Sequence, residues 1–178
     1  IVLLDIYEGF AKGKALDMSQ NGQVLNYNGT ITGTADYKDI AGASVVVVTS
    51  GFPRQPGMTR EDLIAKNAGI VKQVGEGIRD HAPDSTIVMV TNPLDLMTYH
   101  MQKVTGFPSH RVCGQAGVLD SARMTHFVAQ AVGCSEEDVQ AMVLGGHGDT
   151  MVPLPRFTTV GGISITHLLD EETIDAIC

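Results

Sequence analysis

The chain has 178 residues, a formal net charge of -8 at pH 7 and 43% hydrophobic residues, a balance typical of soluble globular proteins with one domain or parts of two. Its 12 basic residues are scattered and form no stripe that would follow a phosphate backbone, so nucleic acid is not expected as a partner. No apolar run reaches the roughly 18 residues that would span a membrane. The three cysteines are widely spaced and indicate reduced thiols in the cytoplasm, and neither cysteines nor histidines have a metal-binding spacing, so no metal is expected.

The first two thirds of the chain alternate between apolar strands and helical patterns. Strands are predicted over residues 1–4, 30–34, 45–49, 87–91 and 111–114. Helices are predicted over residues 14–19, 59–81 and 93–104. Thr59 is placed to cap the second helix with Asp62, and its inner stripe is Leu63, Ile64, Asn67, Ile70, Val71, Val74 and Ile78. This order predicts an α/β fold with a doubly wound parallel sheet of the Rossmann type.

The order of elements changes near residue 117. A helix over 119–132 is followed by strands expected at 139–144, 152–154, 157–160 and 163–165, which is typical of an α+β unit. We therefore predict a dinucleotide-binding domain over residues 1–117 and a substrate or catalytic domain over residues 118–178. The chain begins on a strand without Met and ends inside a helical pattern, so both domains are expected to be truncated parts of a longer protein.

Polar residues at the ends of two predicted strands indicate where a dinucleotide would bind. Asp5 ends the first strand, where an acidic group accepts hydrogen bonds from the adenosine ribose and disfavours the 2′-phosphate of NADP. The Gly-rich phosphate loop of this motif lies about 20 residues before the acid, so that loop and its strand are expected to be missing here. Val90, Thr91 and Asn92 end another strand, and the Asn92 amide is placed to meet nicotinamide or substrate. The alternative for Asn92 is an ordinary Asn-Pro turn.

Residues 51–60 combine two glycines, two prolines and two arginines directly after a strand. This composition suits a lid that carries Arg54 and Arg60 over a pocket. The alternative is a solvated loop with surface arginines.

His147 lies between glycines in the run Gly145-Gly146-His147-Gly148-Asp149-Thr150, as expected for a histidine presented to a ligand. Asp120 and Arg123 lie three residues apart on a predicted helix and share one of its faces. Together they supply a base, a carboxylate to orient it and a cation for a carboxylate substrate. Asp149 is the nearer acid in sequence and could be the partner by proximity, but Asp120 is the preferred partner. The alternative is a structural or exposed histidine.

With the lid, the Asn-Pro turn, the Leu119-Asp120-x-x-Arg123 helix and the Gly-Gly-His-Gly-Asp segment in this order, the chain resembles the lactate/malate dehydrogenase family. Within it, the closest resemblance is to the lactate-dehydrogenase-like malate dehydrogenases of bacteria, and it extends over essentially the whole chain.

The resemblance implies a role for each matching residue. His147 would donate and accept the proton, Asp120 would hold the His147 side chain, and Arg123 would bind the C1 carboxylate of the substrate. Arg60 would polarise the reacting carbonyl, and Arg54 would hold the second carboxylate where lactate enzymes typically carry Gln. The implied cofactor is NAD, with contacts from Asp5, Asn67, Val90, Thr91 and Asn92, of which Asn92 also meets the substrate.

The resemblance also implies an NAD-dependent oxidoreductase that interconverts (S)-malate and oxaloacetate, as in the tricarboxylic acid cycle, and a homodimer or homotetramer. Two alternatives remain open. One is a dehydrogenase for lactate or another 2-hydroxy acid, against which Arg54 argues. The other is an inactive fragment that lacks the phosphate-binding loop.

Overall fold

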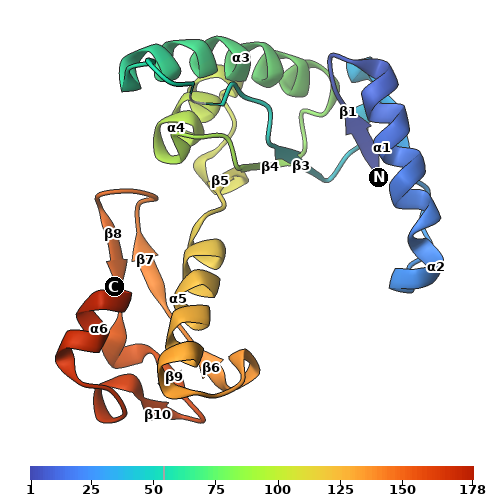
Figure 1. Ribbon diagram of the computed structural model, residues 1–178. Helices are drawn as coiled ribbons and strands as arrows, with labels where there is room; N and C mark the ends of the chain where they lie inside the picture. Colours follow the sequence, from blue (N-terminus) through green and yellow to red (C-terminus); the bar gives the residue numbers. More distant parts are fainter. Residues whose placement is uncertain (54) are drawn as a thin grey trace.

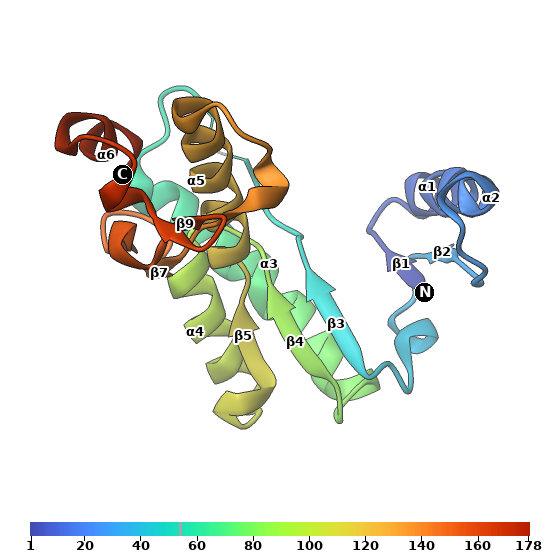
Figure 2. The same ribbon diagram turned by 90° about the horizontal axis from the view of Figure 1, so that it is seen from below.

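The computed structural model describes residues 1–53 and 55–178, and for Arg60 it describes the backbone alone. The N-terminal part contains two parallel sheets (Figures 1 and 2). The first is formed by β1 (Val2–Leu4) and β2 (Thr32–Thr34), and the second by β3 (Val45–Val48), β4 (Thr86–Met89) and β5 (Val112–Gly114) in that order. Its helices are α1 (Glu8–Gln20), α2 (Gly22–Leu25), α3 (Arg60–His81) and α4 (Leu94–Thr105). The prediction of an α/β fold with parallel strands is confirmed.

The main core lies between the second sheet and the pair of helices α3 and α4. Ile87 and Met89 of β4 are fully buried and share a cluster with Val71 of α3 and Met101 of α4. Figure 2 shows both helices on one face of β3, β4 and β5. On the other face Val45 and Val47 are exposed. The predicted inner stripe of α3 is confirmed, since every member is buried or half-buried.

Helix α3 begins with a reciprocal cap. The Asp62 backbone N–H donates to Thr59 Oγ1 over 3.1 Å, and the Thr59 backbone N–H donates to Asp62 Oδ2 over 3.1 Å. These bonds favour the ionised carboxylate, so the hydrogen bonds with Thr59 lower the pKa of Asp62 below its usual value. The predicted cap is confirmed.

The lowered pKa of Asp62 predicts a pH-dependent contribution to folding. A carboxylate whose pKa is depressed in the folded state stabilises it at pH values above the unfolded pKa, and this contribution is lost as pH falls through the folded pKa. In urea unfolding, Asp62→Asn should therefore be less stable than the original chain at about pH 6, and this difference should shrink by about pH 3. The effect will be small because Asp62 is exposed. A difference that does not change with pH would contradict the role of the charge.

The C-terminal part is an α+β unit built around α5 (Gly117–Val132). Strands β6 (Val139–Gln140), β9 (Thr159–Val160) and β10 (Ile163–Ser164) form an antiparallel sheet in the order β10-β9-β6. Strands β7 (Val143–Gly145) and β8 (Met151–Pro153) form a separate hairpin, and α6 (Glu171–Ile177) follows. Met124, Val128 and Ile165 are buried in the core of this unit. Short 3₁₀ helices lie at Tyr37–Ile40, Ser109–Arg111, Glu136–Asp138, Pro155–Phe157 and Ile165–His167.

Several predicted boundaries were wrong. The helix expected over 14–19 begins at Glu8. Its first turns were missed because Gly9 and Gly13 interrupt any apolar stripe and only Ala11 and Ala15 are buried along it. The strand expected over 139–144 is two strands, β6 and β7, which pair with different partners. The strand expected over 157–160 begins as a 3₁₀ turn and only its end is β9. Among the described helices, none has both the length and the apolar character needed to cross a bilayer.

Candidate active site

His147 lies in the tight loop between β7 and β8. Gly145 has φ +86°, and a Cβ at this residue would lie 2.3 Å from the Thr150 carbonyl oxygen. The loop is closed by the Gly146 N–H, which donates to the Thr150 carbonyl over 3.3 Å, and by the Met151 N–H, which donates to the Gly148 carbonyl over 2.9 Å. The glycines therefore allow a turn that brings His147 to the edge of the hairpin.

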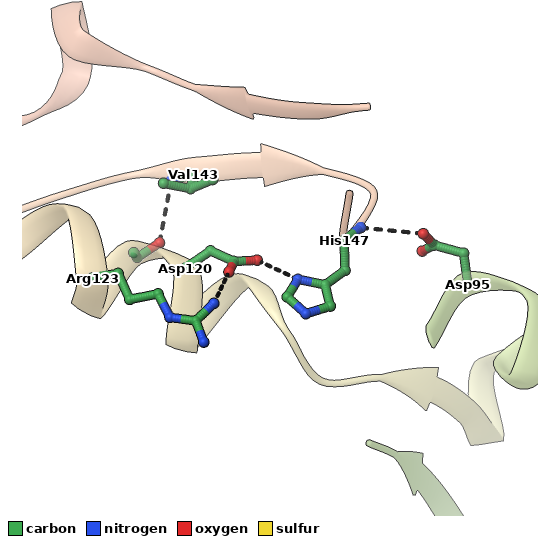
Figure 3. A network of polar contacts seen from close by, with 6 residues as sticks. Asp95, Asp120, Arg123, Val143 and His147 are labelled. Atoms are coloured by element: carbon green, nitrogen blue, oxygen red, sulfur yellow. Dashed lines mark hydrogen bonds and ion pairs between the residues drawn. The ribbon is translucent and has the colours of Figure 1, made fainter. Parts of the chain in front are cut away.

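Asp120 joins His147 to Arg123 (Figure 3). It is 7% exposed in the first turn of α5, and its two oxygens take different partners. Oδ2 lies 2.8 Å from His147 Nδ1, and Oδ1 accepts a bond from Arg123 Nη1 over 3.2 Å. An ionised carboxylate can only accept, so Nδ1 carries a proton and Nε2 lies on the opposite side of the ring.

The one arginine of this cluster is accessible to a ligand. The Arg123 side chain is 59% exposed, so its guanidinium remains accessible beside the buried carboxylate. Asp120 and Arg123 also line a hollow of about 190 Å³ between α5, the hairpin and the end of α6, and His147 is not among its lining residues. A guanidinium fork of this kind binds a carboxylate through two parallel hydrogen bonds.

Ser121, which follows Asp120 in α5, bonds the helix to the hairpin. The Val143 N–H donates to Ser121 Oγ over 3.2 Å. Asp120 and Ser121, which are consecutive in α5, thus hold His147 and the preceding strand β7. The sequence analysis did not identify Ser121, because a hydroxyl that accepts from a backbone N–H has no recognisable spacing.

Among the residues expected to contact a cofactor, Asp5 lies directly after β1 and is half-buried. Its Oδ1 accepts from the Tyr7 N–H over 2.8 Å, while its own N–H donates to the Thr34 carbonyl over 3.1 Å. Val90 continues β4, and its N–H donates to the Val48 carbonyl over 2.9 Å. These residues lie at the carboxyl ends of the strands of the two parallel sheets.

Asn67 connects two loops at this edge. It is 2% exposed, its Oδ1 accepts from the Phe52 N–H over 2.7 Å, and its Nδ2 donates to the Asn92 carbonyl over 2.6 Å. Thr91 is also buried, and its hydroxyl donates to the Ser50 carbonyl over 2.7 Å. The side chain of Asn92 is exposed at the turn that these bonds hold.

The structure does not place the side chains of the two arginines that were expected on a lid. Arg54 lies outside the described residues, and Arg60 is described only as the first residue of α3. One further residue at the site was not singled out from the sequence. Asp95, in the first turn of α4, accepts from the His147 backbone N–H. In the part of the chain that the structure describes, no group of three or more acidic, His or Cys side chains is arranged to hold a metal ion.

The parallel sheets with acidic and amide groups at their carboxyl ends define an α/β protein of the dinucleotide-binding class, followed by a second unit with a His-Asp-Arg cluster. Residues 1–114 match the model of the lactate/malate dehydrogenase NAD binding domain, and residues 117–176 match that of the lactate/malate dehydrogenase alpha/beta C-terminal domain. The chain therefore belongs to the lactate/malate dehydrogenase family.

Relatives and solved structures agree with this assignment. The chain is 56% identical to a malate dehydrogenase of Symbiobacterium thermophilum over 99% of this chain and 57% of the relative. Its structure is similar to malate dehydrogenase from Picrophilus torridus, with a TM-score of 0.92 and 47% identity over 99% of this chain and 56% of that chain. It is also similar to lactate dehydrogenase from Cryptosporidium parvum complexed with lactic acid and nicotinamide adenine dinucleotide, with a TM-score of 0.90 and 43% identity over 99% and 57% of the two chains. The chain spans a little over half the length of these proteins.

Proposed function

We propose that this chain carries part of an NAD-dependent dehydrogenase that interconverts (S)-malate and oxaloacetate. The observation that supports this most directly is the cluster in which Asp120 lies between His147 and Arg123. It combines a titratable group, a buried carboxylate to orient it and a cation for a substrate carboxylate, which reduction of a 2-oxo acid requires. Malate dehydrogenases that are 51–56% identical to this chain point to the same substrate.

In this proposal each residue of the cluster has a separate task. Asp120 fixes the Nδ1 proton and stabilises the imidazolium, so His147 exchanges the proton of the substrate hydroxyl at Nε2. Arg123 binds the C1 carboxylate through its accessible guanidinium. Arg60 polarises the carbonyl, and Asn92 contacts the substrate from the turn after β4.

Asp5 and the turn at Val90–Asn92 would hold the cofactor, and bound NAD would supply the hydride acceptor. The donor set fits this group. Asp5 offers a half-buried carboxylate for ribose hydroxyls, and Asn92 offers an exposed amide at the carboxyl end of the neighbouring sheet. A carboxylate at Asp5 repels the 2′-phosphate of NADP and favours NAD. Asn67 contributes by holding the loops at Phe52 and Asn92 together.

A second candidate is a dehydrogenase for lactate or another 2-hydroxy acid. The structural similarity to lactate dehydrogenase favours it, since the TM-score of 0.90 is close to the 0.92 found with malate dehydrogenase. Arg54 separates the two candidates, because a dicarboxylate needs a second cation.

Arg54 is expected to determine the substrate preference. Arg54→Gln removes the partner of the second carboxylate, so the ratio of kcat/KM for oxaloacetate over pyruvate should fall by about 10- to 100-fold. The ratio is measured with NADH and each 2-oxo acid in parallel. Arg156→Gln, a change of the same type on a 3₁₀ turn of the C-terminal part, is the control. An unchanged ratio in Arg54→Gln would remove this residue from the specificity role.

The proposed activity itself is tested by the consumption of NADH with oxaloacetate or pyruvate. Two proteins are compared, this polypeptide and the same polypeptide fused to the flanking segments of the Symbiobacterium relative. Oxaloacetate turnover by the fusion supports the proposal, and a silent short chain beside it would match the inactive-fragment alternative for these 178 residues alone. Preference for pyruvate supports the second candidate. A folded fusion that is inactive with both acids would overturn the assignment.

Assembly and location are further parts of the proposal. Phe10, Leu16, Val24 and Leu25 expose apolar side chains on α1 and α2, which supports a homodimer or homotetramer. The three cysteines are free, which fits a reducing compartment such as the cytoplasm.

A further inference from the structure

The loop that carries His147 contacts a second part of the chain besides α5. Asp95 is the second residue of α4, and its Oδ2 accepts the His147 backbone N–H over 3.1 Å across 52 residues of sequence. His147 is therefore held at two points: its ring by Asp120 from α5, and its backbone by Asp95 from the N-terminal part (Figure 3). The two contacts come from different helices and fix different atoms.

The close approach of Asp95 to the loop also involves Gly146. A Cβ at Gly146 would lie 2.9 Å from the same Oδ2 of Asp95 and 2.3 Å from Thr150 Oγ1. A side chain at Gly146 would push against both neighbours. The glycine therefore allows the Asp95 carboxylate to approach the loop this closely.

A simpler explanation is that Asp95 only compensates the dipole of its own helix. Acidic side chains in a first turn commonly have this role. However, Pro93 is the N-cap of α4, that cap has no side-chain hydrogen bond, and Asp95 Oδ2 bonds to the distant His147 segment. The dipole explanation predicts that loss of Asp95 weakens the start of α4 without a specific effect on the His147 amide. Glu172, the second residue of α6, is the control for loss of a first-turn carboxylate because it has the same helical position and is exposed.

We propose that Asp95 is a positioning residue that fixes the backbone of the His147 loop against the start of α4. Asn92 lies three residues before Asp95, so the contact ties the histidine loop to the turn that carries Asn92. The significance for catalysis rests on the proposed function. Loss of the contact leaves the ring bonded to Asp120 but allows its backbone to shift relative to Asn92, which should reduce turnover more than substrate binding.

The positioning role is tested first without any activity measurement. In the 178-residue chain labelled with ¹⁵N-histidine, Asp95→Ala should move the His147 backbone amide resonance and speed its hydrogen exchange. Asp95→Asn should largely restore both, because its amide oxygen still accepts. Glu172→Ala should leave both unchanged. If Asp95→Ala leaves the resonance and the exchange rate as they were, or if Glu172→Ala changes them equally, the proposal is overturned.

The kinetic consequence is measured in the fused protein. Asp95→Ala should lower kcat by about 10- to 100-fold with a smaller change in KM, and Asp95→Asn should recover most of the loss. Glu172→Ala should match the unsubstituted fusion. A normal kcat in Asp95→Ala would overturn the catalytic part of the proposal. If the unsubstituted fusion is inactive with both 2-oxo acids, the proposed function fails, while the amide measurement still decides whether Asp95 positions the loop.

Discussion

Replacing His147 with asparagine is expected to lower oxaloacetate turnover by about 10²- to 10⁴-fold, the range for loss of a general acid or base. The asparagine amide nitrogen occupies nearly the place of Nδ1 and can still donate to Asp120. Asp120 is only 7% exposed, and without this donor it would keep Arg123 alone as a side-chain partner. The substitution removes Nε2 and the ability to titrate. Steady-state kcat and kcat/KM in the fused protein, with circular dichroism to confirm folding, measure the effect.

The chain offers a matched control for this substitution. His126 is also a histidine whose Nδ1 meets a carboxylate, at 2.6 Å from Glu136, but the pair is exposed at another part of α5. His126→Asn should therefore keep its turnover. Equal losses in the two variants would mean that removal of any histidine from this unit disturbs folding, and a His147→Asn enzyme with normal turnover would remove His147 from the reaction.

The largest effect on stability is expected at the contact between β2 and α1. A Cβ at Gly33 would lie 2.2–2.3 Å from the backbone atoms of Ala11 and Lys12. Backbone atoms of a helix cannot rotate away as a flexible side chain can, so Gly33→Ala must separate the strand from the helix. We expect a loss of about 1–3 kcal/mol or more in the free energy of unfolding, measured by urea titration.

Gly29→Ala is the control for the change in backbone entropy, because nothing lies within 4 Å of its added Cβ. We expect its effect to be small, within about 1 kcal/mol. Hydrogen exchange in α1 should speed up in Gly33→Ala alone. Equal stabilities of the two variants would show that α1 does not pack as closely on β2 as the structure indicates.

The sequence predicted the helices and strands that arise from local residue patterns. Consecutive valines over 45–48 and the Thr59-Asp62 cap identified β3 and α3, because a run of β-branched residues and a capped helix start are each characteristic patterns. Helix α1 was predicted too short, since it has hardly any buried stripe. The break between β6 and β7 was missed because Ala141-Met142 contains neither Gly nor Pro, and only the choice of pairing partners reveals it.

The residues of the site also divide into those that the sequence identified and those that only the structure revealed. Asp120 was preferred over Asp149 as the partner of His147 from the sequence, and the structure places Asp120 Oδ2 2.8 Å from His147 Nδ1. Asp95 and the buried bonds of Asn67 involve backbone groups of distant loops, and such partners depend on how the chain folds back on itself. The catalytic and binding roles of these residues remain predictions for the experiments above.

The separation of β1 and β2 from the larger sheet has a thermodynamic consequence. Within the described residues β1 and β3 are not paired with each other, and α1 covers β2. The first sheet meets the rest of the N-terminal part through Leu4, which packs against the main core, and through the 3₁₀ helix Tyr37–Ile40. Two parts of a chain that share few contacts unfold with limited cooperativity. The calorimetric enthalpy of unfolding of this chain should therefore exceed its van 't Hoff enthalpy. A ligand held at once by Asp5 and the Asn92 turn would join the two parts into one cooperative unit, and its binding would then appear as sharper melting as well as a higher midpoint temperature.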